Sequence, residues 1–385
     1  MSRAHEGRRQ KNSLRRRPAA PSDKSGSNKA VSKIRLGLVG AGGMGQTAHL
    51  QNFATIPECE IVALAEGRAR TAELVARRWG IPRIYPDHRA MLEDCQLDAV
   101  VAIMDYHLHA SVVPDILNAG LPVMTEKPIA VRPETGRRLA ELAEQKGVPY
   151  MVGYMKRSLP AAVEAAARVR HWRESGEAGP MNYLRATMPP GDWVFGIQWG
   201  LSAGDAPPPY EGVVPETPPD WMDAGLAGRY DAFVNYYIHQ VNLIRYLAGE
   251  DYHVTYADRN GAVMIGETES GVTLTLEMKG RGLRNSWEEF YLVSFENGRV
   301  DLSVPAPMAQ QNGGDVRIYF GGSGDELPRW ERPVMPPVWS MLAQARHFIQ
   351  CVRDGSPVRS PASEAAKDLE VAEQYVRALS RTLQG

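Results

Sequence analysis

The chain has 385 residues, which is long enough for one large domain or two ordinary ones, and its hydrophobic fraction of 43% can fill a sizeable core. With 23% charged residues and a net charge of −1, it shows no global attraction to nucleic acid or to a membrane surface. Three widely spaced cysteines exclude a disulfide framework and a cysteine-based zinc motif, and no apolar run is long enough to span a bilayer.

Residues 1–30 differ from the rest of the chain in composition. They hold nine basic and two acidic residues among prolines, serines and glycines, with almost no large apolar side chain. Such a segment cannot bury enough apolar surface to fold, so we predict a disordered basic tail. No apolar stretch follows the arginines, so we expect no export signal. We interpret the segment as a solvated tail or an overlong start site in preference to a nucleic-acid arm.

Between residues 31 and 153, short apolar runs alternate with segments of helical composition. The strand-like runs are 34–39, 61–65, 98–104, 122–125 and 150–152. The helical segments are 46–55, 68–79, 110–119 and 133–146, each closely followed by glycine or proline. This alternation predicts an α/β fold, with a doubly wound parallel sheet that forms a Rossmann dinucleotide-binding domain.

From residue 154 to 385 the pattern is that of an α+β domain. Helices are predicted over 161–174, 232–248, 338–353 and 362–382. Strands are predicted over 181–188, 252–257, 271–278, 290–296, 298–304 and 315–320, which indicates a largely antiparallel sheet. Residues 189–228 are rich in proline, glycine and tryptophan and show no period, which is typical of a lid or of a packing loop.

A glycine-rich motif, Gly40-Ala41-Gly42-Gly43-Met44-Gly45, follows the first predicted strand and opens a helix. In a dinucleotide site Gly40 allows the tight turn, Gly42 lets the backbone approach the pyrophosphate, and Gly45 lets helix and strand pack closely. The N–H groups at the start of the helix, around Gly43 and Met44, then face the anion. We predict that this motif binds the cofactor pyrophosphate.

The choice between NAD and NADP depends on two side chains. Glu66 lies 21 residues beyond Gly45, at the end of the second strand, where a carboxylate accepts hydrogen bonds from the ribose and repels a 2′-phosphate. Arg68 either pairs with the extra phosphate of NADP or is plain helix surface. We predict NAD, with NADP as the alternative.

The segment Thr125-Glu126-Lys127-Pro128-Ile129, directly after a parallel strand, resembles the Gfo/Idh/MocA family, which acts mostly on sugars and cyclitols. The resemblance covers nearly all of residues 33–383. Further family-like pieces are His109, Gly153 and Arg157 in GYMKR, the helix around His239, and the closing HFIQCVRDG segment. Met104-Asp105 departs from the Thr-Pro that is usual near the nicotinamide.

The resemblance implies that Lys127 lies beside the nicotinamide and the reacting carbon, with Glu126 and His109 on the cofactor side. Lys127 would hydrogen-bond the substrate hydroxyl and stabilise negative charge that develops on its oxygen. Hydride leaves carbon only as the hydroxyl proton is removed, so a base and a positive group must both be near. The alternative for Lys127 is a surface turn before a proline.

The family places an acidic residue four positions before a histidine, on one face of a helix. Here His239 matches the histidine and is the predicted general base, while Asn235 stands in the acidic position. An asparagine can orient a hydroxyl but cannot hold a proton. Two proton paths are then open: His239 acts without a carboxylate partner, or Tyr236 or Tyr237 shares the proton relay. The alternative is that His239 is only a packed core histidine.

The expected reaction is reversible oxidation of a secondary alcohol on a sugar, sugar derivative or cyclitol. Trp193 offers an aromatic face to a sugar ring, and Arg157 reaches substrate or cofactor unless it is a helix-start charge. The alternatives are an NAD-dependent, redox-neutral glycosidase and a non-catalytic NAD-sensing regulator. We expect a cytoplasmic protein without metal, nucleic-acid or membrane partner, and the resemblance implies a homo-oligomer, either dimer or tetramer.

Overall fold

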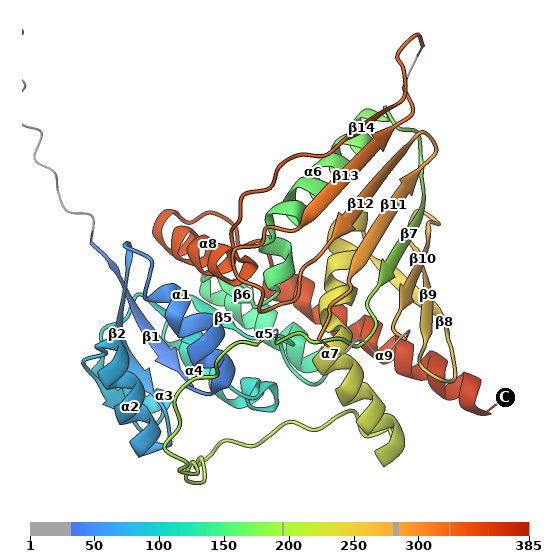
Figure 1. Ribbon diagram of the computed structural model, residues 1–385. Coiled ribbons are helices and arrows are strands. Elements are labelled where there is room, and N and C mark those ends of the chain that lie inside the picture. The colour runs from blue at the N-terminus through green and yellow to red at the C-terminus, as the bar shows by residue number, and fades with distance from the viewer. Residues whose placement is uncertain (1–31, 195, 280–284, 323, 385) are drawn as a thin grey trace, which may run out of the picture. The chain divides into compact units, whose positions relative to one another are not determined.

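The computed structural model describes residues 32–194, 196–279, 285–322 and 324–384 (Figure 1). The predicted tail, residues 1–30, lies outside the described residues. From Lys33 onward the chain forms one compact unit. Among the described helices, none combines the length and the apolar character that a membrane crossing requires.

The first half of the chain forms a six-stranded sheet in the order β3-β2-β1-β4-β5-β6, with every pair parallel. The strands are β1 (Ile34–Val39), β2 (Cys59–Ala65), β3 (Ile84–Tyr85), β4 (Ala99–Ala102), β5 (Val123–Thr125) and β6 (Tyr150–Val152). β4 is buried along its whole length, because helices cover both faces of the sheet. The prediction of a doubly wound parallel sheet is confirmed.

The helices of this sheet largely follow the predicted segments. They are α1 (Gln51–Phe53), α2 (Ala69–Trp79), α3 (His88–Asp94), α4 (His109–Asn118) and α5 (Pro133–Lys146). The helix predicted over 46–55 is present, but it begins as a fully buried π-helical turn, η1 (Gly45–Leu50), that continues into α1. The short elements β3 and α3 were not predicted, since two strand residues and two helical turns give too little periodicity.

The second half forms an eight-stranded sheet in the order β14-β13-β12-β11-β7-β10-β9-β8, and only the β7–β10 pair is parallel. The strands are β7 (Met181–Thr187), β8 (Tyr252–Ala257), β9 (Val263–Thr268), β10 (Thr273–Glu277), β11 (Phe290–Phe295), β12 (Gly298–Ser303), β13 (Asp315–Phe320) and β14 (Arg329–Glu331). The largely antiparallel α+β arrangement is confirmed, although β9 and β14 were not predicted.

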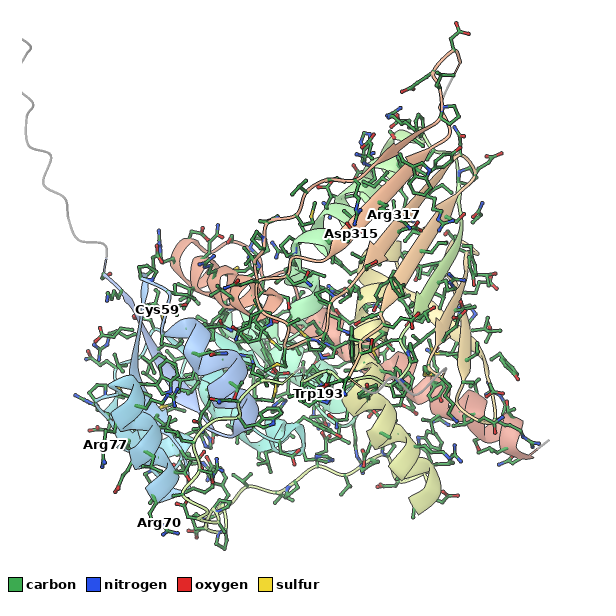
Figure 2. All side chains as sticks on the ribbon, viewed as in Figure 1. Cys59, Arg70, Arg77, Trp193, Asp315 and Arg317 are labelled. Carbon is green, nitrogen blue, oxygen red and sulfur yellow. The ribbon has the colours of Figure 1, made fainter. Side chains whose placement is uncertain are left out.

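The second half of the chain has four long helices: α6 (Pro160–Ser175), α7 (Ala224–Ala248), α8 (Ser340–Asp354) and α9 (Ala362–Gln384). Of these, α8 packs against η1, α1 and β1 of the first half. α6, α7 and α9 contact the strands of the eight-stranded sheet, and α9 also packs along α5 of the first sheet (Figure 1). Trp172 on α6 is buried against Phe295 and Phe320 of the sheet. Buried and more exposed side chains alternate along the strands: on β13, Asp315 and Arg317 share the more exposed face (Figure 2), whereas Val316 and Ile318 are buried.

Residues 189–223 connect β7 to α7, and we call them the crossing loop. α7 begins eight residues earlier than predicted, at Ala224, where Asp223 accepts a hydrogen bond from the N–H of Leu226. The described part of the loop is anchored on the Rossmann domain. Its hydrogen-bonded anchor pairs are Leu201–Gln46, Asp205–Thr71, Tyr210–His88, Val214–Ser111, Glu216–Val131 and Asp220–Arg132.

Candidate active site

A pocket of about 820 Å³ lies at the carboxyl ends of strands in the six-stranded sheet. Parallel α/β sheets bind ligands at this edge, because the loops after the strands converge there. The pocket also receives residues from α7 and from the crossing loop. Predicted site residues that line it are Gly40, Gly42, Gly43, Met44, Gly45, Glu66, Arg68, Glu126, Lys127, Trp193, Asn235, Tyr236 and His239.

The glycine turn fits a dinucleotide pyrophosphate. Gly40 has a φ of 86°, and a Cβ there would lie 2.1 Å from the Ile103 carbonyl oxygen. A Cβ on Gly45 would lie 2.8 Å from the Gly40 oxygen. A Cβ on Gly42, by contrast, would meet no atom within 4 Å, so this backbone faces open space in the pocket. The fold therefore requires glycine at positions 40 and 45, whereas Gly42 leaves room for a ligand.

Glu66 directly follows β2, and both oxygens of its carboxylate already accept hydrogen bonds. Oε2 accepts hydrogen bonds from the N–H of Ala41 (2.8 Å) and from the guanidinium of Arg68 (2.7 Å). Oε1 accepts from the N–H (3.0 Å) and Nε (2.8 Å) of Arg68. Burial acts to raise the pKa of Glu66, but Arg68 and Ala41 outweigh it and hold the pKa below its ordinary value. A carboxylate has about four lone-pair positions, so a ribose hydroxyl would have to replace bonds from Arg68.

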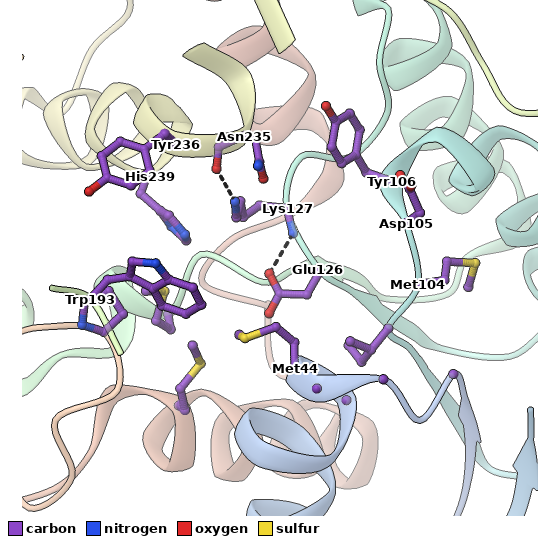
Figure 3. Close-up of a pocket in the computed structure, with 18 of the residues that line it drawn as sticks. Met44, Met104, Asp105, Tyr106, Glu126, Lys127, Trp193, Asn235, Tyr236 and His239 are labelled. Atoms are coloured by element: carbon purple, nitrogen blue, oxygen red, sulfur yellow. Dashed lines mark hydrogen bonds between the residues drawn. The ribbon is translucent and has the colours of Figure 1, made fainter. Parts of the chain in front are cut away.

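Glu126 and Lys127 follow β5 and enter the pocket from the sheet side (Figure 3). Glu126 Oε1 lies 2.6 Å from His49 Nε2, and Oε2 accepts from the N–H of Lys127 at 3.1 Å. Burial acts to raise the pKa of Glu126, but His49 and Lys127 outweigh it and lower the pKa. Glu126 is therefore an ionised group that fixes the strand end rather than a free acid.

Lys127 reaches across to α7, where its Nζ donates a hydrogen bond to the backbone oxygen of Asn235 at 2.5 Å (Figure 3). Burial lowers the pKa of Lys127, Glu126 acts in the opposite direction, and the nearby Lys156 lowers the pKa further. A lysine of this kind gives up a proton more readily than one in water.

His239 lines the pocket one helical turn beyond Asn235, on the same face of α7 (Figure 3). Among the described residues its buried Nδ1 has no hydrogen-bond partner, and its ring meets Tyr154 edge-on at 5.9 Å. Burial, Lys127 and Lys156 all lower the pKa of His239 well below its ordinary value. The imidazole is therefore neutral at pH 7 and can accept a proton.

Of the two tyrosines considered for a proton relay, only Tyr236 lines the pocket. Its hydroxyl accepts a long hydrogen bond, 3.4 Å, from the N–H of Gly191 in the crossing loop. Tyr237 instead donates to the backbone oxygen of Met278 at 2.7 Å. The relay through Tyr237 is therefore not favoured by the geometry.

The structure places Lys156, and not its neighbour Arg157, in the pocket. Arg157, predicted to reach substrate or cofactor, does not line the pocket; it is buried, and its Nε donates to Asn242 Oδ1 at 2.6 Å. Lys156, its neighbour in η3 (Met155–Ser158), lines the pocket and contacts both carboxylate oxygens of Glu289, at 2.6 and 2.7 Å. Only its position beside Arg157 in GYMKR signalled Lys156 in the sequence.

His109, predicted on the cofactor side, begins α4 and also lies outside the pocket lining. It is fully buried, with Nδ1 3.1 Å from the backbone oxygen of Ile129. Burial lowers the pKa of His109 to about 4, against the action of Ile129 and Glu126. His109 therefore contacts the segment that follows Lys127 rather than the pocket itself.

The low pKa of His109 makes stability depend on pH. Since the folded state holds the imidazole neutral and the unfolded state protonates it near pH 6.5, stability falls as pH drops from 6.5 toward 4. We expect His109 to contribute a loss of about 2 kcal/mol between pH 7 and pH 5. Denaturant unfolding at both pH values should show a smaller difference in His109→Asn than in the wild type. His171→Asn, at an exposed histidine, is the control; equal pH dependence in all three proteins would contradict the assignment.

Residues 34–154 match the model of an oxidoreductase family with an NAD-binding Rossmann fold, GFO_IDH_MocA. The rhizopine catabolism protein MocA of Rhizobium meliloti is 27% identical, over 92% of this chain and 97% of its own length. The scyllo-inositol 2-dehydrogenase (NAD(+)) of Bacillus subtilis is 25% identical, over 88% and 92%. The crystal structure of apo scyllo-inositol dehydrogenase from Lactobacillus casei shares the fold, with a TM-score of 0.65, 17% identity and coverage of 91% and 97%.

The chain therefore carries, in residues 34–154, an NAD-binding Rossmann domain of the Gfo/Idh/MocA oxidoreductase type, and it is similar to the MocA protein and to scyllo-inositol 2-dehydrogenase along most of its length. It is an NAD(P)-dependent dehydrogenase that acts on CH–OH groups, as predicted from the glycine motif and Lys127.

Proposed function

We propose that the enzyme oxidises, reversibly, a secondary hydroxyl of a sugar, sugar derivative or cyclitol, with NAD as the cofactor. One observation carries the proposal: Lys127, Asn235 and His239 share a single pocket with the glycine turn and Glu66. The scyllo-inositol 2-dehydrogenase, which aligns along most of the chain, supports a cyclitol or sugar-like substrate.

The cofactor contacts follow from the turn and from the end of β2. The N–H groups around Gly42, Gly43 and Met44 would hold the pyrophosphate, and Glu66 would accept hydrogen bonds from the ribose. The bound nicotinamide supplies the hydride acceptor, or the hydride donor in the reverse direction.

The proton is handled by Lys127 and His239. The ammonium of Lys127 would stabilise negative charge on the substrate oxygen, while it keeps its hydrogen bond to Asn235. His239, neutral and without a partner on Nδ1, would accept the hydroxyl proton. Because Lys127 and Lys156, and no carboxylate of the described residues, act on the imidazole, His239 would pass the proton on rather than store it. The amide of Asn235 would orient a hydroxyl.

The rest of the lining suits a neutral ring. Trp193, Trp287 and Tyr236 offer aromatic faces to the C–H side of a sugar or cyclitol. The cation of Lys156 is already paired with Glu289, so it adds no unpaired charge for an acidic substrate.

The test is a panel of sugars, glycosides and cyclitols with NAD and with NADP, followed by absorbance of the reduced cofactor. We expect turnover of at least one neutral polyol with NAD. Chromatography of the products shows the reaction type: glycoside cleavage without net NADH would replace the proposal by a redox-neutral glycosidase. Cofactor binding without any turnover across the panel would favour a regulator.

The Glu66→Ala variant tests cofactor choice. We expect NAD to bind about tenfold more weakly, because ribose hydrogen bonds are lost, and NADP to bind more tightly, because Arg68 is freed. Fluorescence titration with both cofactors measures this. Glu60→Ala, at an exposed position on the same strand, is the control, and unchanged affinities in Glu66→Ala would remove Glu66 from the site.

A further inference from the structure

The N-terminus of α2 is capped by a residue from a distant part of the chain. Its own N-cap residue, Arg68, makes no side-chain cap. Instead, Asp205 of the crossing loop accepts hydrogen bonds from the N–H groups of Arg70 (2.9 Å) and Thr71 (3.3 Å). Its other carboxylate oxygen lies 2.5 Å from the Thr71 hydroxyl. These contacts fix the carboxylate of Asp205 beside the loop that joins β2 to α2.

The same contacts place Asp205 at the cofactor edge of the pocket. Two residues further on, Pro207 lines the pocket, together with Glu66 and Arg68. Pro207 and Pro208 lie so close to Gly67 that a Cβ there would be 3.6 and 3.3 Å from them. Asp205 also acts on Arg68 electrostatically and, after Glu66, raises the pKa of its guanidinium.

A 2′-phosphate on the adenine ribose needs positive charge and free N–H donors where β2 meets α2. Here the guanidinium of Arg68 is paired with Glu66, and Asp205 occupies the helix N–H groups. The three side chains together carry one net negative charge. An added phosphate would meet two carboxylates and would find the helix donors taken.

We infer that Asp205 is a second determinant of cofactor choice, which excludes the 2′-phosphate of NADP by charge and by occupying the α2 donors. The inference rests on the proposed NAD site and extends it to a residue of the crossing loop, about 140 positions beyond Glu66. Glu66 would favour NAD by accepting hydrogen bonds from the ribose hydroxyls. Asp205 would disfavour NADP by repelling its 2′-phosphate and would make no contact with NAD.

The Asp205→Asn variant isolates the charge, because asparagine caps a helix about as well as aspartate. We expect NADP to bind about fivefold more tightly at low salt, with the affinity for NAD changed less than about twofold, and the gain to shrink as salt screens the charge. Fluorescence titration with each cofactor measures both affinities without depending on turnover. Asp220→Asn is the matched control, since Asp220 lies in the same loop, pairs with Arg132 and does not line the pocket.

Thr71→Val separates charge from anchoring, because it removes the hydroxyl contact and leaves the carboxylate. An unchanged ratio of NADP to NAD affinity in Thr71→Val, with a raised ratio in Asp205→Asn, supports the inference. An unchanged ratio in Asp205→Asn, or an equal change in Thr71→Val or Asp220→Asn, overturns it. A wild-type protein that fails to bind NAD refutes the proposed function itself, and a response to Glu66→Ala without one to Asp205→Asn refutes only the role of Asp205.

Discussion

Replacement of Lys127 by alanine should lower kcat by about a thousandfold, because the charge that stabilises the substrate oxygen and the hydrogen bond to α7 are both lost. The affinity for NAD should change only a few-fold, since the glycine turn and Glu66 remain. Stopped-flow or steady-state absorbance gives kcat, and fluorescence titration gives the cofactor affinity.

Lys146→Ala is a suitable control for this variant, because Lys146 is an exposed lysine in the last turn of α5, outside the pocket. It should keep wild-type turnover. A Lys127→Ala enzyme with unchanged kcat would show that another group stabilises the oxygen. Loss of cofactor binding equal to the loss of turnover would instead give Lys127 a role in holding the dinucleotide.

The second large effect is expected from alanine substitutions in the glycine turn. One variant should lose stability, and the other should lose affinity for NAD. In Gly40→Ala, the left-handed backbone and the contact with Ile103 should destabilise the fold by about 3 kcal/mol or more. In Gly42→Ala, the new methyl group meets no protein atom, so stability should remain unchanged. The affinity of Gly42→Ala for NAD should still fall by about tenfold or more, because the methyl group blocks the approach of the pyrophosphate.

Thermal unfolding and NAD titration of both variants separate the two effects. Each variant serves as the control for the other, because the chemical change is the same. Wild-type NAD affinity in Gly42→Ala would mean that the pyrophosphate lies elsewhere. A stable Gly40→Ala protein would mean that the turn relaxes away from Ile103.

The elements that could be predicted are those whose own residues form a clear sequence pattern. β1 and β4 are short apolar runs, since both of their faces are covered, and such runs stand out in the sequence. β3 has only two residues, and β9 carries the strand-breaking Gly266, so neither has a usable pattern. The early start of α7 was missed because the irregular composition of the crossing loop continues into its first turn.

The residues of the candidate site likewise fall into those that the sequence predicts and those that it does not. Lys127 and His239 belong to recognisable motifs, and both line the pocket. No role for Lys156 or Asp205 could be predicted from the sequence, because their partners are remote: Glu289 is 133 residues from Lys156, and Thr71 is 134 from Asp205. Which of two adjacent residues, Lys156 or Arg157, faces the pocket is set by the short turn η3, which no periodicity predicts.

The crossing loop also bears on how such an enzyme can diversify. One uninterrupted stretch carries Trp193 on the substrate side and Asp205 on the cofactor side, only twelve positions apart. With the proposed roles of these residues, transplanting this segment from a relative would transfer preferences for the ring and for the dinucleotide together. Selection for a new polyol substrate would then also change the preference for NAD or NADP, and the two preferences would be inherited together.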